Sequence, residues 1–264
     1  MSAEAVPIGT RKTSPPLRLF VHQLRAEQLV FWRSREAALF IFLFPLLLFM
    51  LLGSVYSGTI YGVPASHALL AGLIAYGCAN TAFAGLAIQL VLRRENAILK
   101  RLRGTPLPAA TYVAALLVST LLVFVLQTVA LFLLGRVLYG TPFPSALGSI
   151  AVAVVLGSAV FAALGVAAAS LIRSGEGSSA VVNFILLPMA FLTGSFGPTR
   201  HFPAFLRDIG DVLPLKYFVD LVNAIYLHGQ AFWSQPEAIA VLVAWGAGGL
   251  VVALFKFRWE PRGQ

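Results

Sequence analysis

The chain has 264 residues, of which 59% are hydrophobic and 11% charged. An ordinary soluble domain is about 45–50% apolar and about 25% charged, so this composition excludes a soluble globular fold and is typical of a protein that lies in lipid. The formal net charge is +9, which could suit nucleic acid, but the positions of the basic residues make that role unnecessary. One cysteine, Cys78, cannot form an internal disulfide.

The first residues predict a short tail followed by an amphipathic helix. Residues 1–16 are polar, and no apolar core with a cleavage site follows at signal-peptide distance, so we expect no cleaved signal. In residues 17–35, apolar residues such as Leu17 and Val21 recur at near-helical spacing, and basic residues lie off that face. The pattern predicts a helix in the cytoplasmic interface, with Trp32 at headgroup level. A polar linker is the alternative.

Long stretches without charge predict six membrane-spanning helices. A hydrocarbon core of about 30 Å needs about 20 residues at 1.5 Å each. The apolar runs are continuous, so helices are expected rather than the short alternating strands of a barrel. The expected class is therefore an all-α polytopic membrane protein, with one transmembrane domain over residues 37–256. The expected spans cover residues 37–57, 67–92, 109–135, 146–172, 178–197 and 236–256.

Basic residues predict the orientation of these spans. Fifteen lysines and arginines lie in segments on one side of the predicted bundle, and four lie on the other. Positively charged loops stay in the cytoplasm. Both tails, residues 1–16 and 257–264, are therefore expected in the cytoplasm. The distribution accounts for the net charge without nucleic acid.

The outer segment 198–230 is too apolar for a solvated loop and is interrupted by Pro198, Pro203 and Pro214. A full span here would carry charged residues into the bilayer centre, which is costly. We expect a re-entrant pair of short helices that dips in from the outer face and packs against protein.

The sequence lacks the residues that ATP binding, serine hydrolysis and ion-coupled transport usually require. Residues 9–13 do not have the spacing or the second glycine of a phosphate-binding loop, so ATP is not expected to bind this chain by that route. Ser195 lacks a nucleophile elbow and an intramembrane base, which leaves an intramembrane enzyme as the weakest alternative. Ionisable residues are absent from the span interiors, which disfavours a gradient-driven carrier or channel but leaves it as the alternative.

The loop after the second span predicts a short cytoplasmic helix over residues 94–103. Ile98, Leu99 and Leu102 form one apolar edge, while basic residues point to water, and Gly104 ends the helix. Such a helix suits the docking of another protein. A basic loop that only obeys the positive-inside rule is the alternative.

The same loop resembles the coupling helix of type-2 ABC exporter permeases, through Arg94-Glu95, the run from Leu99 to Arg103, and Thr105-Pro106-Leu107. The outer segment is similar to the motif before and within that family's re-entrant hairpin: Phe191 to Phe196, Pro203, and Leu213 to Tyr217. The resemblance covers about Leu17 to Phe257. Asn223 departs from the pattern, which often has Arg or Gln there.

The resemblance implies a transmembrane permease subunit of an ATP-driven exporter in the cell membrane, the bacterial inner or plasma membrane. It implies outward movement of a hydrophobic or amphipathic substrate, such as a drug, lipid or glycolipid. It also implies a second permease chain, identical or similar, and a separate ATPase subunit that binds the ATP. On this reading the chain is not itself an enzyme and holds no cofactor or metal.

The resemblance also implies two groups of site residues, and leaves the substrate-binding residues unidentified. Glu95 is the leading coupling residue, because a carboxylate at the start of a helix is favoured by the helix dipole. The expected coupling residues are Arg94, Glu95, Leu99, Lys100, Arg101 and Arg103. The expected residues of the outer hairpin are Phe196, Pro203, Pro214 and Tyr217.

Overall fold

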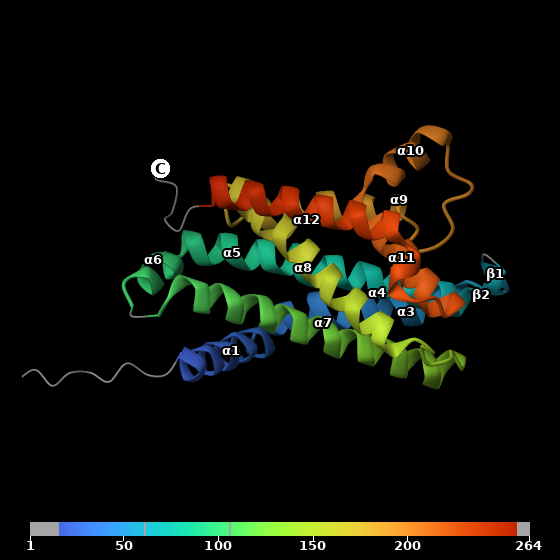
Figure 1. The fold of residues 1–264 in the computed structure, drawn as a ribbon, viewed down its shortest axis with the longest axis horizontal. Helices are drawn as coiled ribbons and strands as arrows, with labels where there is room; N and C mark the ends of the chain where they lie inside the picture. Colours follow the sequence, from blue (N-terminus) through green and yellow to red (C-terminus); the bar gives the residue numbers. More distant parts are fainter. Residues whose placement is uncertain (1–15, 61, 106, 258–264) are drawn as a thin grey trace, which may run out of the picture.

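A computed structural model describes residues 16–60, 62–105 and 107–257. In this part of the chain, long helices lie side by side in one bundle, with a two-stranded β-hairpin at one end (Figure 1). The predicted class, an all-α polytopic membrane protein, is confirmed. The tails of residues 1–15 and 258–264, which were expected in the cytoplasm, lie outside the described residues.

The N-terminal part is an amphipathic helix followed by the first long apolar helix. Helix α1 covers Pro16–Arg33. Ser34 then caps the next helix, because its Oγ accepts a hydrogen bond from the Ala37 amide at 3.4 Å. That helix runs from Arg35 to Val55 and is built of α2 (Arg35–Ala37), the π-helix η1 (Ala38–Leu43) and α3 (Phe44–Val55). The turn predicted after it contains the antiparallel strands β1 (Thr59–Ile60) and β2 (Val63–Pro64).

The second long helix, Ala65–Glu95, is the centre of the bundle. Its apolar part is wholly buried by the rest of the chain, so neighbouring helices cover it on every side. Gly165 shows how close this packing is, because a Cβ there would lie 2.8 Å from two carbonyl oxygens of the central helix. The central helix consists of α4 (Ala65–Cys78), the π-helix η2 (Ala79–Gly85) and α5 (Leu86–Glu95).

The remaining elements pack around this centre. Helix α6 covers Ile98–Arg103, α7 covers Ala109–Tyr139 and α8 covers Leu147–Leu171. Helix α8 packs against α12, η2 and α5, and α7 packs against α1 and α4. The last elements are α9 (Ser178–Leu192), α10 (Ala204–Val212), α11 (Pro214–His228), the 3-10 helix η3 (Phe232–Ser234) and α12 (Pro236–Lys256).

The fifth apolar helix is shorter than the sequence predicted. Five helices of the described chain are long and apolar enough to cross a membrane, and α9 is a shorter apolar helix of 15 residues. It ends at Leu192 rather than at residue 197, because Gly194 (φ 81°) and Gly197 (φ 147°) fold the next residues into a turn that an α-helix cannot continue. The count of six spans therefore stays a prediction.

Two short helices occupy the region of the predicted outer hairpin. Helix α10 begins after Pro203 and α11 begins at Pro214, as expected from a ring that fits the first turn of a helix. Helix α11 packs against α4, α8 and α12. Whether the pair dips into a bilayer stays a prediction.

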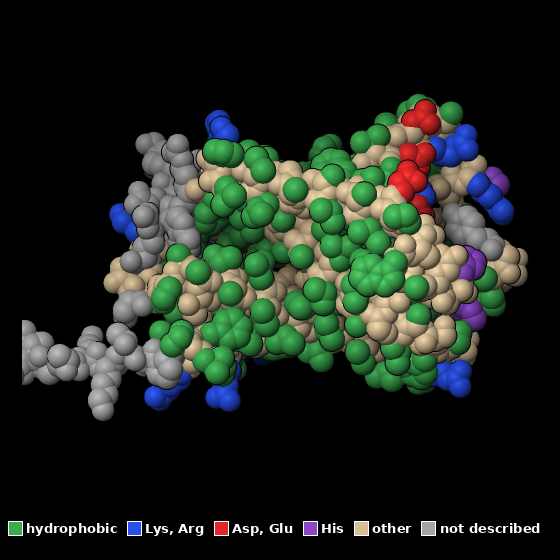
Figure 2. Space-filling view, in the orientation of Figure 1, with side chains coloured by type: hydrophobic (Ala, Val, Ile, Leu, Met, Phe, Trp, Pro, Cys, Tyr) green, Lys and Arg blue, Asp and Glu red, His purple; other side chains and the backbone are tan. Residues whose placement is uncertain are grey.

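Apolar and charged side chains occupy different parts of the surface along the bundle. Figure 2 shows hydrophobic side chains over the middle of one face and charged side chains toward its two ends. Phe184, Leu254 and Phe255 are among the large apolar side chains that are at least three-quarters exposed. Lipid can cover such a band without a desolvation cost, which is why a polytopic fold tolerates it.

Candidate functional site

Helix α6 projects from one end of the bundle on a sharp elbow. It lies at the same end as the start of α1 and the end of α12 (Figure 1). Ala97 joins α5 to α6 with φ 54°, and it is the only residue other than glycine with positive φ in the described part of the chain. This conformation costs roughly 1–2 kcal/mol for an L-residue, so the surrounding contacts must hold it. Leu99, with 0% exposure, anchors α6 on the bundle.

The outward side of α6 is basic. Lys100 and Arg101 are exposed, and Arg101 donates a hydrogen bond to the backbone oxygen of Asn96 at 3.5 Å. Ile98 is 40% exposed, so the predicted apolar edge rests mainly on Leu99. Arg103 is the last residue of α6, and its side chain lies outside the described residues.

The predicted position of Glu95 is wrong. Helix α6 begins at Ile98, not at residue 94, and Glu95 is the last residue of α5. The run from Arg93 to Glu95 consists of good helix formers, so the central helix continues through it. Glu95 therefore lies at a helix C-terminus, where the dipole disfavours a carboxylate. It is exposed and lies over Gly175, where a Cβ would overlap its carboxylate.

Arg94 is a buried link between two long helices rather than a surface residue. It is 3% exposed, and its guanidinium donates to the backbone oxygens of Ala169 at 2.8 Å and Ile172 at 2.5 Å. These carbonyls lie at the C-terminal end of α8, where helix carbonyls lack partners within the helix. Charge-assisted bonds to them join α5 to α8. Arg94 cannot contact a partner subunit in this arrangement.

A second buried arginine, Arg93, joins three helices and was missed by the sequence analysis. Its two terminal nitrogens donate to the two carboxylate oxygens of Glu27 at 2.9 and 2.6 Å, and one of them also donates to the Tyr112 hydroxyl at 2.8 Å. Gln23 donates to the same carboxylate at 2.8 Å. Helices α1, α5 and α7 thus meet in one bidentate ion pair. The only sequence signal for this ion pair was Glu27, the one acidic residue in the otherwise basic helix α1.

This contact also changes the predicted face of α1. Glu27 is buried, and Gln28 donates to the Ser119 hydroxyl of α7 at 2.8 Å. Leu17 and Val21, which belong to the predicted apolar face, are 72% and 40% exposed. The protein-facing side of α1 is therefore partly polar. The placement of α1 in a membrane interface stays a prediction.

Uncharged amides connect the first long helix to its neighbours inside the bundle. Asn80 of η2 donates to the Phe40 carbonyl at 3.0 Å, and Gln127 of α7 donates to the Ile41 carbonyl at 2.7 Å. Both carbonyls belong to η1. Thr81 donates to the Gln127 oxygen at 3.3 Å. The π-helix η1 thus lies beside side chains that satisfy its carbonyls, and two amides within apolar runs were the available sequence signal.

The residues of the predicted outer hairpin are structural in this arrangement. Phe196 is buried, with its ring centroid 4.8 Å from that of Tyr76. Pro203 precedes α10, Pro214 opens α11, and Tyr217 is half-buried. They form the turn and helix starts at the end of the bundle away from α6 and do not converge on one reactive centre.

Ser195 is buried, and its hydroxyl lies 3.5 Å from that of Thr193, so no general base contacts it in the described chain. No group of three histidine, cysteine, aspartate or glutamate side chains that could hold a metal is found in that part either.

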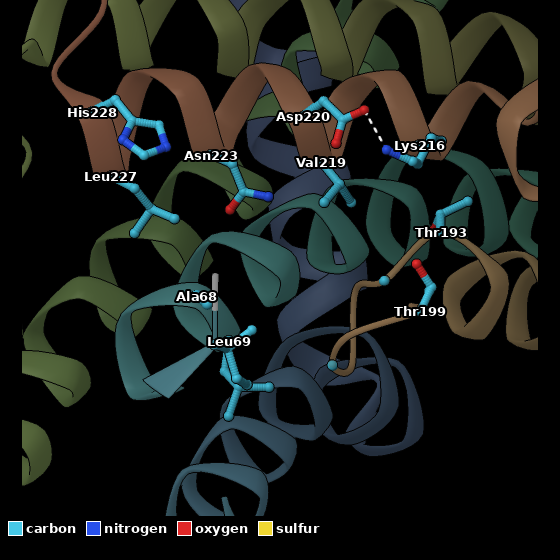
Figure 3. Close-up of a pocket in the computed structure, with 13 residues that line it drawn as sticks. Ala68, Leu69, Thr193, Thr199, Lys216, Val219, Asp220, Asn223, Leu227 and His228 are labelled. Atoms are coloured by element: carbon cyan, nitrogen blue, oxygen red, sulfur yellow. Dashed lines mark hydrogen bonds and ion pairs between the residues drawn. The ribbon is translucent and has the colours of Figure 1, made fainter. Parts of the chain in front are cut away.

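The described part of the chain also has a cavity and a groove. A cavity of about 220 Å³, named the outer cavity after the predicted orientation, lies between α4, the α9–α10 loop and α11 (Figure 3). A lateral groove of about 580 Å³ lies between α8, α9 and α12, with Phe83, Met189 and Trp245 among its mainly apolar lining residues and Arg173 at one end.

A family model described as ABC-2 type transporter matches residues 18–227, which include α1, the α6 elbow and α11. The chain belongs to the ABC-2 type transporter family. It is 27% identical over 170 residues to the inner membrane transport permease YhhJ of Escherichia coli, covering 64% of this chain and 46% of that protein. It is 22% identical over 173 residues to the probable multidrug ABC transporter permease YbhR of the same species, covering 64% and 47%.

A third relative is the putative transport permease YvfS of Bacillus subtilis, which is 25% identical over 163 residues, covering 61% of this chain and 64% of that protein. The chain spans about half the length of the E. coli relatives it matches. The predicted resemblance is confirmed at the level of the family.

Proposed function

We propose that the chain is the membrane-spanning permease subunit of an ATP-driven exporter, which pairs with a second permease chain. The observation that carries the proposal is the α6 elbow. A short helix with exposed Lys100 and Arg101 projects from one end of the bundle and is anchored by buried Leu99. A separate ATPase subunit docks on this helix, and ATP binds to that subunit.

The contacts of α5 supply a route for motion from α6 into the bundle. Helix α6 follows α5 after only Asn96 and Ala97. Arg93 links α5 to Glu27 of α1, and Arg94 links it to the end of α8. A displacement of α6 therefore moves α5 together with α1 and α8, rather than bending one loop. Coupling through packed elements and ion pairs of this kind is physically contiguous.

The lateral groove supports a hydrophobic or amphipathic cargo, such as a drug, lipid or glycolipid, moved outward. Its volume of about 580 Å³ lies within the range of about 300–1,000 Å³ that is typical of sites for drug-sized ligands. Its walls are mainly apolar, and Arg173 and Ser174 supply polar groups at one end. An apolar chain with a polar head matches this distribution.

The test is co-purification with the ATPase encoded nearest to this chain. We expect the native chain to form a complex that hydrolyses ATP, and Lys100→Glu with Arg101→Glu to reduce capture at least tenfold while still inserting. The matched control is Arg136→Glu with Arg200→Glu, two exposed charges away from α6, which should capture the ATPase like the native chain. A native chain that inserts but captures no ATPase would overturn the proposal in favour of a gradient-driven carrier or channel.

A further inference from the structure

Helix α1 presents a basic face away from the bundle. Arg18, Arg25 and Arg33 are exposed and follow one another by seven and eight residues, so they lie near one face of a helix with 3.6 residues per turn. Within the described residues, none of the three forms an ion pair. Glu27 is the one acidic residue of α1, and it is buried in its ion pair with α5. The exposed face of α1 therefore carries positive charge without a carboxylate to compensate it.

The contacts of α1 with α5 and α7 fix which face points outward. Glu27 is bonded to Arg93 of α5 at 2.6 Å, and Gln28 donates to the Ser119 hydroxyl of α7 at 2.8 Å. Glu27 follows Arg25 by two residues, which is a rotation of about 200° around the helix. Rotation of α1 would break these bonds, so the arginines are held away from the bundle. Figure 2 shows basic side chains along the edge where Figure 1 places α1, whereas the acidic side chains of this view lie at the other end.

An apolar edge of α1 runs beside the basic face. Leu17, Val21 and Trp32 are 72%, 40% and 42% exposed, and their spacing of four and eleven residues places them along one edge of the helix. The Trp32 indole donates to the Gln28 side chain at 3.1 Å, and its ring centroid lies 5.2 Å from that of Phe42 in η1. Trp32 is thus fixed where α1 meets the first long apolar helix. An apolar edge beside basic residues is typical of a helix that lies at the level of the lipid headgroups.

The chemistry of this surface matches the phosphate of an anionic lipid. Helix α1 contains no lysine, and the guanidinium of arginine presents a planar fork that binds a phosphate through two hydrogen bonds. Arg35 and Glu36 follow at the start of α2 and together add no net charge. A zwitterionic lipid would bring an ammonium group beside uncompensated arginines, whereas an anionic lipid brings its phosphate without one. A soluble phosphate would leave the apolar edge uncovered, but the acyl chains of a lipid cover it.

We propose that α1 binds anionic phospholipids, such as phosphatidylglycerol, in the leaflet at the α6 end of the bundle. Their phosphates contact Arg18, Arg25 and Arg33, and their acyl chains lie along the edge formed by Leu17, Val21 and Trp32. This surface rests on α1 and not on the docking of an ATPase at α6, so it stands whether or not the proposed coupling holds.

The test reads lipid contacts at Trp32 in the full chain. The chain has four tryptophans, and phenylalanine replaces the other three. Nanodiscs contain phosphatidylcholine and phosphatidylglycerol in equal amounts, with bromine on the acyl chains of one lipid or of the other. Bromine quenches the fluorescence of a tryptophan that it contacts, so the ratio of the two quenching efficiencies reports which lipid lies beside α1. A second chain keeps only Trp233, which is 74% exposed and precedes α12 at the opposite end of the bundle (Figure 1).

The test variant replaces Arg18, Arg25 and Arg33 with glutamine in the chain that keeps Trp32. The matched control in the same chain replaces three other exposed arginines with glutamine and so removes the same charge away from α1; these are Arg136, Arg200 and Arg207. Melting in nanodiscs of phosphatidylcholine alone checks the fold, and both variants should melt like the chain with native arginines.

We expect brominated phosphatidylglycerol to quench Trp32 about threefold more strongly than brominated phosphatidylcholine, because basic residues on an amphipathic helix attract anionic lipids. The ratio should fall to about one in the test variant and at high salt, which screens the attraction, and it should persist in the control variant. Equal quenching by the two lipids with native arginines would overturn the proposal. A preference that survives in the test variant, the same preference at Trp233, or little quenching by either lipid would also overturn it.

Discussion

Glu27 and Arg93 are two charged side chains that folding removes from water at the meeting point of α1, α5 and α7. Their side chains are 4% and 11% exposed. Removing one partner of such a pair leaves the other charge buried and unpaired, whereas removing both is much less harmful. The ion pair therefore holds α1 on the bundle, and the stability of this contact depends on both residues being present.

We expect Glu27→Gln and Arg93→Gln each to destabilise the protein by about 3–5 kcal/mol, the cost of breaking a buried ion pair. The double variant Glu27→Leu with Arg93→Leu should lose less than the two single changes combined. Melting in nanodiscs, followed by tryptophan fluorescence, measures this. Lys216→Gln is the control, because its ion pair with Asp220 is more exposed and should be worth about 1 kcal/mol or less. Additive losses would show that the two charges do not interact.

A different effect is expected from substitution of Arg94, because its partners are backbone oxygens at the end of α8. Lysine keeps the charge but cannot present two donors in a planar fork. We expect Arg94→Lys to loosen the α8–α9 connection, and hydrogen–deuterium exchange at residues 173–178 to rise several-fold. Arg101→Lys, on the exposed side of α6, should leave that exchange unchanged. Equal exchange in native and Arg94→Lys protein would contradict the role of Arg94 as a cap.

At the scale of elements, the helix contacts rely on glycine where backbones approach each other. Gly72 of α4 lies against the Ser195 carbonyl, and a Cβ would overlap that oxygen. Gly72→Ala should therefore destabilise the protein and displace the turn after α9. Gly148→Ala is the matched control, because nothing lies within 4 Å of a Cβ there, and alanine favours a helix by up to about 1 kcal/mol. Comparison of the two melting temperatures measures the effect, and a Gly72→Ala variant as stable as the native chain would refute it.

Gln127 joins α7 to the π-helix η1, because it donates to the carbonyls of Ile41 and Phe42 at 2.7 and 3.1 Å. We expect Gln127→Leu to cost about 1–2 kcal/mol, the upper part of the range for interhelical hydrogen bonds in membranes. Thr128→Val is the control, because Thr128 bonds only its own helix, at Phe124. The melting temperatures of the two variants check this. Equal losses would show that the hydrogen bonds of Gln127 to η1 do not stabilise the protein.

The sequence predicted the positions of the helices better than it predicted the contacts between their side chains. Long charge-free runs predicted the apolar helices, and Gly104 and the prolines predicted where α6, α10 and α11 lie. A short helix, α6, lies in the predicted loop, but Glu95 was misplaced, because residues 93–95 are good helix formers that suit the end of α5 as well as the start of α6. Glu27 lies 66 residues from Arg93, and the two carbonyl partners of Arg94 lie 75 and 78 residues away, and no local pattern reports such a distance. The π-helix η1 likewise depends on Asn80 and Gln127, which belong to other helices.

At the scale of the molecule, the chain offers a simple test of its orientation. Its one cysteine, Cys78, is buried in the central helix, so it should not react with a water-soluble maleimide. Lys100→Cys on α6 and Asp208→Cys on α10 add exposed thiols at the two ends of the bundle (Figure 1). The positive-inside rule predicts labelling of Asp208→Cys in intact cells, and of Lys100→Cys only after permeabilisation. The reverse pattern would invert the assignment of the cytoplasmic end.

The burial of the central helix has a consequence for biosynthesis. This helix is the least hydropathic of the five long apolar helices, yet its apolar part is covered on all sides. Much of that cover comes from α7, α8 and α11, which the ribosome makes later. When the central helix has just been made, only the earlier helix α3 among its main neighbours exists to cover it. We therefore expect it to stay beside the insertion machinery until α7 and α8 have been translated, and we expect the yield of the whole protein to depend on that delay.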